Sequence, residues 1–188
     1  PGSTVIYDVK CTGKLAPEIV RSGGVPMMWK TGHSLIKAKM RETGAQLAGE
    51  MSGHFFFKER WYGFDDGIYA AARLMEILSN DNRPPQQVFN DLHKGMSTPE
   101  LNIPMKEGET HRFVEEFRKR AKFDGARMTL IDGVRADWPD GWGLVRASNT
   151  TPVLVLRFDA DNRNALARIQ EEFRRHLLAL APKMKLPF

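Results

Sequence analysis

The sequence has one cysteine and no long apolar run, and both shortages narrow the class of protein. Cys11 stands alone among 188 residues, which excludes an internal disulfide and fits a reducing compartment. No stretch approaches the ~20 consecutive apolar residues that a membrane-spanning helix needs. We therefore expect a cytoplasmic protein without a membrane partner.

Motifs for nucleotides and metals are also missing. Gly13-Lys14 lacks the other residues of a P-loop. His93, His111 and His176 stand at spacings that match no metal site. The sequence therefore predicts no metal ligands in this chain.

What is present includes an excess of positive charge. Lys and Arg number 28 against 23 Asp and Glu, a net charge of +5. That balance suits an anionic partner, either a phosphate ester or a nucleic acid. A basic run at 118–122 lies on the polar face of a predicted helix, where solvation is the usual outcome. No array of basic and aromatic residues accompanies it, so we expect no nucleic-acid partner.

The first half of the chain alternates predicted strands with predicted helices. Apolar periodicity predicts strands over 4–9, 25–29, 46–50 and 54–57 and helices over 14–21 and 34–42. A further helix follows Asp65 and Asp66, which stand where N-caps belong. Its apolar face is formed by Ile68, Ala71, Ala72, Met75 and Leu78. This alternation predicts an α/β domain over residues 1–95.

The second half begins after a predicted loop at 80–85 and a linker at 94–99. Strands are predicted over 101–105, 128–131, 142–146 and 153–158. Thr110 and Asp161 are expected to cap two amphipathic helices. The order strand, helix, three strands, helix predicts a smaller α+β domain over residues 96–188.

Gly49-Glu50-Met51-Ser52-Gly53-His54 is the segment richest in chemistry. Glu50 can accept two hydroxyl donors, Ser52 can donate and accept, and His54 can transfer a proton near neutral pH. On an extended backbone Glu50 and Ser52 would face the same side. These side chains suit a polyol such as a sugar ring, although a polar turn between two strands would account for them as well.

A second polar segment, Arg146 to Pro152, suits a phosphate. It combines the guanidinium of Arg146 with the polar side chains of Ser148, Asn149 and Thr150. Asn and Ser also favour a turn before a strand. Both interpretations can hold together, because a turn whose N–H groups point one way binds anions.

These two segments, together with Tyr7-Asp8-Val9-Lys10-Cys11, Trp29-Lys30-Thr31-Gly32-His33-Ser34 and Asp65-Asp66-Gly67, resemble the alpha-D-phosphohexomutase family. The likeness is strongest to its bacterial phosphomannomutase/phosphoglucomutase group. It implies most of the third domain and the fourth domain of a four-domain enzyme. The family's phosphoserine loop and magnesium loop are absent here. We therefore expect a C-terminal fragment whose partner is a missing N-terminal half.

The resemblance also implies roles for individual residues. The residues implied to bind the sugar are Lys10, His33, Glu50 and Ser52. The residues implied to bind the substrate phosphate are Arg146, Ser148, Asn149 and Thr150. His54 is the implied general acid or base. The plainer alternatives are a solvated lysine for Lys10 and a helix cap for His33.

The implied activity interconverts hexose 1-phosphates and 6-phosphates of mannose or glucose. It uses a phosphoserine, Mg²⁺ and glucose 1,6-bisphosphate, and the resemblance places the serine and the metal ligands outside this chain. The fragment alone is then expected to be inactive. Two alternatives stay open: a non-catalytic sugar-phosphate-binding module, and a phosphohexomutase with amino-sugar specificity.

Overall fold

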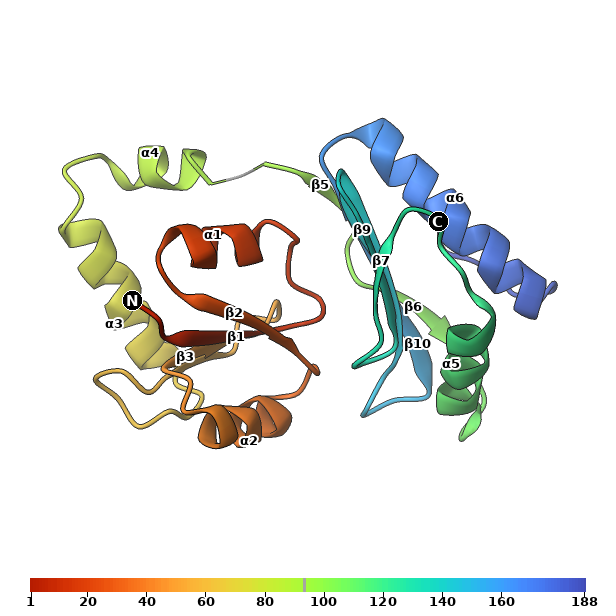
Figure 1. Ribbon diagram of the computed structural model, residues 1–188, viewed down its shortest axis with the longest axis horizontal. Helices are drawn as coiled ribbons and strands as arrows, with labels where there is room; N and C mark the ends of the chain where they lie inside the picture. The colour runs from red at the N-terminus through yellow and green to blue at the C-terminus, as the bar shows by residue number, and fades with distance from the viewer. Residues whose placement is uncertain (93) are drawn as a thin grey trace. The chain divides into compact units, whose positions relative to one another are not determined.

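The computed structural model describes residues 1–92 and 94–188. It divides into two compact units, Pro1–Lys94 and Gly95–Phe188 (Figure 1). His93, one of the histidines considered above, lies outside the described residues.

Unit 1 is the α/β fold that the alternation predicts. Its elements are β1 (Thr4–Asp8), α1 (Leu15–Arg21), β2 (Val25–Trp29), α2 (His33–Thr43), β3 (Leu47–Gly49), β4 (Phe55–Phe57), α3 (Gly67–Ser79) and α4 (Pro85–Asn90). The strands form a sheet in the order β2-β1-β3-β4. β1 runs parallel to β2 and β3, whereas β4 runs antiparallel to β3.

Alternate residues of the unit 1 strands pack against helices on opposite faces of the sheet. Ile6 and Phe56 lie in one core cluster with Ile36 of α2. Tyr7, the neighbour of Ile6, lies in another cluster with Ile19 of α1. Figure 1 shows α1 and α2 on opposite sides of these strands. The period of two along each strand therefore produces two core layers.

Helix α3 turns its predicted apolar face outward. Ile68 is 87% exposed and Met75 is 64% exposed. The helix instead packs through Tyr69, whose ring lies edge-on 5.5 Å from that of Phe57. The guanidinium of Arg73 lies 4.8 Å from the centre of the same Phe57 ring. The helix is thus correctly predicted, but its apolar stripe is not the side that contacts the sheet.

Unit 2 has the predicted α+β fold. Its elements are β5 (Met96–Ser97), β6 (Leu101–Pro104), α5 (Glu109–Arg120), β7 (Arg127–Thr129), β8 (Val134–Trp138), β9 (Gly141–Ala147), β10 (Val153–Ala160) and α6 (Arg163–Leu180). The sheet order is β5-β10-β9-β8-β7, and β6 also pairs with β10. Figure 1 shows α5 and α6 on one face of this antiparallel sheet.

The sequence prediction missed β8 and treated β5 as linker. In β8, Val134 and Ala136 are fully buried in the core and alternate with Arg135 and Asp137. Arg135 is buried because it pairs with Asp137 at 2.8 Å and lies 3.9 Å from the Trp142 ring centre. The alternation of apolar and polar residues over 134–138 was an available strand signal that the sequence prediction overlooked.

Two of the predicted helix caps are wrong. Asp66 does cap α3 and accepts a hydrogen bond from the backbone three residues on. The residue before α5 is Gly108, with a left-handed φ of 76°, and Thr110 lies inside the helix. Asn162 caps α6, one residue after the predicted Asp161. A cap depends on the backbone conformation at the helix start, which composition alone leaves open by a residue or two.

Candidate functional site

The predicted sugar-binding residues meet at one edge of the unit 1 sheet. Because β1, β2 and β3 are parallel, the loops after them leave from the same edge. Lys10 lies on the first of these loops and Glu50 with Ser52 on the third, His33 is the first residue of α2 after the second loop, and β4 starts just after His54. The rings of His33 and His54 lie 6.2 Å apart between centroids. Topology therefore gathers residues that are up to 44 positions apart in the sequence.

Glu50 and Ser52 lie in a turn between β3 and β4, not on an extended backbone. The chain turns here, because Gly53 N donates to Glu50 O at 3.0 Å and Glu50 N donates to His54 O at 2.9 Å. Glu50 is buried, and its Oε1 accepts a hydrogen bond from Gly32 N at 2.5 Å. Ser52 is exposed. The backbone is therefore a turn between two strands rather than extended, and Glu50 also links two loops.

Asp8 organises this edge and was not recognised in the sequence. It is fully buried at the end of β1. Its Oδ1 accepts from Met51 N at 3.1 Å and from the Cys11 thiol at 3.1 Å, and its Oδ2 accepts from the Thr31 hydroxyl at 2.9 Å. One carboxylate thereby ties three loops together. The available sequence signal for this role was an acidic residue at the end of an apolar strand.

Asp65 is the second residue whose role the sequence did not reveal. It was predicted as a helix cap, but its Oδ2 lies 2.6 Å from His54 Nδ1. Both side chains are partly exposed, at 46% for His54 and 34% for Asp65. A carboxylate at this distance orients the imidazole and favours a proton on Nδ1. Lys10, in contrast, is buried at the same edge.

In unit 2 the predicted phosphate loop folds into a tight turn beside a small cavity. Ser148 Oγ accepts hydrogen bonds from the amides of Thr150 and Thr151, each at 3.3 Å. The cavity has a volume of about 210 Å³ and is lined by the 148–152 loop and the start of α5. His111 and Glu107 also line it. The positive end of the α5 dipole adds to its suitability for an anion, whereas the Glu107 carboxylate opposes it.

Arg146 lies on β9, two residues before Ser148, and is 4% exposed. Its Nε donates to Asp132 Oδ2 at 3.1 Å. Its Nη2 is buried and has no hydrogen-bond partner within the described ranges. Arg146 is absent from the described residues that line the cavity. The structure therefore keeps Ser148, Asn149 and Thr150 together and holds the guanidinium against Asp132, with Nη2 buried and outside the cavity lining.

Gly133 explains how Asp132 reaches Arg146. Its φ is 80°, and a Cβ built there would lie 2.2 Å from Val145 O and 2.7 Å from Arg146 Cα. Both the left-handed backbone and the close approach require glycine at this turn. The turn thus places the Asp132 carboxylate beside the guanidinium.

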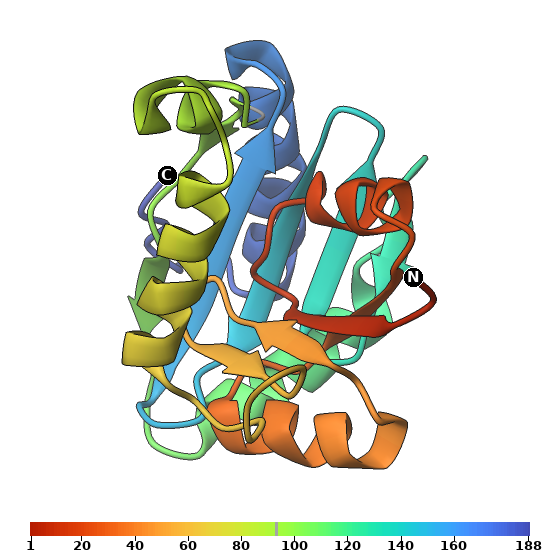
Figure 2. The ribbon, with the colours of Figure 1, turned by 90° about the vertical axis from the view of Figure 1, so that its left-hand side faces the viewer.

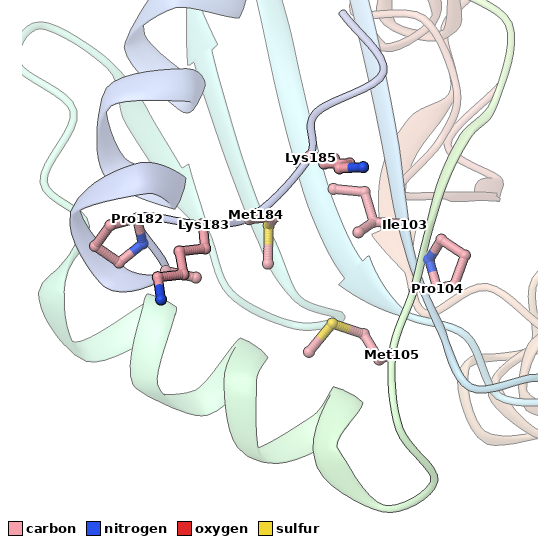
Figure 3. Close-up of a pocket in the computed structure, with 8 residues that line it drawn as sticks. Ile103, Pro104, Met105, Pro182, Lys183, Met184 and Lys185 are labelled. Atoms are coloured by element: carbon pink, nitrogen blue, oxygen red, sulfur yellow. The ribbon is translucent and has the colours of Figure 1, made fainter.

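Other features of the described residues lie apart from these sites. Among residues 1–92 and 94–188, no group of three His, Cys, Asp or Glu side chains is arranged to hold a metal ion. No helix in that part of the chain is long and apolar enough to cross a membrane. A cavity of about 540 Å³ in unit 2 lies at the end of α6, where Met105 and Met184 extend toward each other (Figure 3). It is mainly apolar and contains none of the predicted site residues.

Comparison with known proteins matches both units to one family. The family model described as "Phosphoglucomutase/phosphomannomutase, alpha/beta/alpha domain III" matches residues 1–95. The family model of the C-terminal domain of the same family matches residues 100–176. A crystal structure of a phosphoglucomutase/phosphomannomutase family protein from Burkholderia thailandensis is 57% identical with a TM-score of 0.92, covering 100% of this chain and 40% of that one.

Curated relatives give the same assignment. A protein from Pseudomonas aeruginosa named phosphomannomutase/phosphoglucomutase is 57% identical over all 188 residues, which make up 41% of its length. A phosphoglucomutase from Neisseria meningitidis is 58% identical over 177 residues, 93% of this chain and 38% of that protein. The chain thus spans about two fifths of the length of these relatives. With both units matched, the chain belongs to the phosphoglucomutase/phosphomannomutase family.

Proposed function

We propose that this chain is the substrate-binding C-terminal part of a cytoplasmic phosphohexomutase that interconverts hexose 1-phosphates and 6-phosphates. Residues 1–95 would bind the sugar, and residues 96–188 would bind the phosphate that is not reacting. A missing N-terminal half would supply the phosphoserine. The observation that carries the proposal is the gathering of Lys10, His33, Glu50, Ser52 and His54 at one sheet edge in a chain of this family.

The geometry of unit 1 supports sugar binding with proton transfer. The turn at residues 50–53 is fixed from both sides, by Asp8 through Met51 N and by Glu50 through Gly32 N. A fixed turn can present a carboxylate and a hydroxyl to ring hydroxyls without an ordering cost. His54 would exchange a proton with the reacting hydroxyl through the ring nitrogen that does not face Asp65.

The geometry of unit 2 supports phosphate binding. A phosphate oxygen that reached Arg146 Nη2 would satisfy this buried donor, which does not itself line the neighbouring cavity. The hydroxyls and amides of the 148–151 turn offer further donors at the neighbouring cavity. A mutase must hold either end of a hexose bisphosphate, and a clamp specific for phosphate alone serves both half-reactions.

Magnesium and glucose 1,6-bisphosphate belong to the proposed complete enzyme. The described residues offer no cluster fit for Mg²⁺, so its ligands would lie in the missing half and no step above passes through it. The P. aeruginosa relative is named for mannose and glucose phosphates, and its 57% identity leads us to propose these hexoses over amino sugars.

A chimera tests this proposal. The part of the P. aeruginosa relative that this chain does not match would be joined to Pro1. Conversion of glucose 1-phosphate to glucose 6-phosphate would be followed with a coupled dehydrogenase, with Mg²⁺ and glucose 1,6-bisphosphate present. We expect turnover by the chimera, none by the 188-residue chain, and a large loss in a chimera carrying His54→Ala.

Other outcomes would change the assignment. Turnover by the isolated chain that survives repurification would contradict the division of labour between the halves. A folded but inactive chimera that binds glucose 1-phosphate would leave only a sugar-phosphate-binding module.

A further inference from the structure

The cavity of about 540 Å³ at the end of α6 has no part in the proposed function, and we call it the methionine cavity after Met105 and Met184 in its lining. Figure 2 shows β8, β9 and β10 side by side, with α6 behind them. Where α6 ends, the segment 181–185 lines one side of the cavity, and the end of β6 lines the other. The cavity therefore lies entirely within unit 2.

The segment that follows α6 is fixed at both ends. Met184 N donates to Ala181 O at 3.0 Å, which turns the chain as it leaves the helix. Farther along, the ring of Phe188 lies 4.7 Å from that of Phe158 in the core. The guanidinium of Arg174 lies 5.2 Å from the centre of the Phe188 ring. The cavity is thus already formed, and a ligand could bind there without the cost of ordering a loop.

The lining is apolar apart from two lysines. Ile103 is buried in it, whereas Met105 and Met184 are half-buried and extend toward each other (Figure 3). Thioether side chains are flexible and polarisable, so two methionines can pack around an alkyl chain. Binding sites for small molecules have volumes of about 300–1,000 Å³ and an apolar lining with a few polar groups. The methionine cavity has both properties.

The charge at the cavity has one sign. Lys183 and Lys185 are exposed, and no carboxylate is among the described residues of the lining. Several cations of the unit 2 helices pair with a carboxylate three residues away, as Arg175 does with Glu172 at 2.6 Å. Neither lysine has an ion pair in the part of the chain that the structure describes. Two such ammonium groups beside an apolar cavity are complementary to an anion that carries an apolar tail.

A second cavity, of about 410 Å³, indicates which way such a ligand would lie. It shares Met105 with the methionine cavity. Its lining contains the carboxylates of Glu109 and Glu116 and a single cation, Arg112. Like charge would disfavour an anionic head group there. The head group is therefore expected at the two lysines, with the alkyl chain directed toward Met105.

We propose that the methionine cavity binds a single-chain alkyl anion, such as a medium-chain carboxylate. The chain would lie on Ile103 between Met105 and Met184, and the carboxylate would lie at Lys183 and Lys185. This site is independent of the proposed mutase function, since none of the residues proposed to bind sugar or phosphate lines it. The segment 181–185 also follows residue 176, where the match to the family model of the C-terminal domain ends.

Methyl NMR of the 188-residue chain tests the proposal with decanoate as the probe. The nine methionines would be ¹³C-labelled at their methyl groups, and decanoate would be added below its micelle concentration. We expect saturable shifts of the Met105 and Met184 signals and much smaller shifts of the other methionines.

Shorter and partial ligands show which parts of the probe are recognised. Octanoate and hexanoate should bind progressively more weakly, by up to about fourfold for each methylene lost, because a buried CH₂ contributes that much. Acetate has the charge without the chain, and decan-1-ol has the chain without the charge. Each should bind at least tenfold more weakly than decanoate.

Charge reversal supplies the matched variants. Lys183→Glu combined with Lys185→Glu should weaken decanoate binding about tenfold, because attraction at the head group becomes repulsion. The control is Lys58→Glu combined with Lys122→Glu, the same change of charge at two exposed lysines outside the cavity. It should bind decanoate like the unchanged chain. All four lysines are exposed, so folding should persist in both variants.

Absent binding, or equal binding by the charge-reversal and control variants, would overturn the proposal. An affinity that does not rise with chain length would also overturn it, because the contact would then be a surface ion pair alone. Co-sedimentation with phosphatidylglycerol vesicles, without binding of free decanoate, would make the lysines a membrane contact and remove the proposed site. None of these measurements depends on turnover, so they leave the test of the mutase proposal separate.

Discussion

His54 Nδ1 lies 2.6 Å from Asp65 Oδ2, although the two residues belong to different segments of unit 1. The histidine precedes β4, and the aspartate precedes the N-cap of α3. An isolated bridge between Phe56 and Asp65 holds the two segments side by side. The backbone thus supports the contact between the side chains.

We expect Asp65→Asn to lower kcat of the chimera about ten- to a hundred-fold with little change in KM. An asparagine loses the charge-assisted hydrogen bond, which is worth about 1.5–3 kcal/mol. Asp65 would act as a positioning residue, so Asp65→Glu should restore part of the rate. Steady-state kinetics on the three proteins would check this.

Asp66→Asn is the control for Asp65, because the two aspartates are adjacent. Asp66 accepts from Tyr69 N at 2.9 Å and from Trp61 Nε1 at 3.1 Å, which are structural contacts. The loss of one of these two carboxylate acceptors should lower the melting temperature and leave kcat largely unchanged. Equal effects of both changes on kcat would remove the special role of Asp65.

Arg146→Ala should weaken binding of glucose 1-phosphate by the chimera about ten- to a hundred-fold, the range for charge-assisted contacts. Arg146→Lys should restore only part of the affinity, because lysine lacks the planar fork that can hold Asp132 and a phosphate together. Calorimetric titration would measure both. Unchanged affinity in a folded Arg146→Ala protein would exclude the phosphate role.

Ser52→Ala should weaken glucose 1-phosphate binding about two- to tenfold and leave inorganic phosphate binding unaffected. Ser52 is exposed in its turn, so the change removes a hydroxyl without disturbing packing. Glu50→Gln should also weaken glucose 1-phosphate binding. The turn should stay in place, because the glutamine amide oxygen can still accept from Gly32 N. Equal losses for both ligands would assign the turn to structural support.

Gly133→Ala should destabilise the chain by about 2 kcal/mol or more, because it combines a left-handed φ with a backbone clash. Gly125→Ala is matched to it: φ is 70° there, and nothing lies within 4 Å of the built Cβ. That variant should cost about 1 kcal/mol, from backbone strain alone. Urea unfolding of both variants would separate the cost of backbone strain from the cost of the steric clash. Similar losses of unfolding free energy in the two variants would contradict the close approach to Arg146.

Local sequence patterns were sufficient for most of the secondary structure. The strand at Val25–Trp29 was predicted to the residue, and the long helix α6, predicted to be amphipathic, buries Ile169, Phe173 and Leu177. Period-two and period-3.6 spacing reflect how a single element presents its side chains, so they can be read from one segment. The alternating pattern of β8 was overlooked, whereas the outward face of α3 could not be predicted from one segment alone.

The sequence by itself determined which chemical groups the site contains and which family they indicate. Only the tertiary structure decided what each group contacts: Asp8 with Met51, His54 with Asp65, and Arg146 with Asp132. These partners lie 11 to 43 residues apart along the chain. Such pairings follow from strand order and from the turns that bring loops to one edge, and no local periodicity encodes them. Burial then decides which of these charged groups need a partner, because water no longer solvates them.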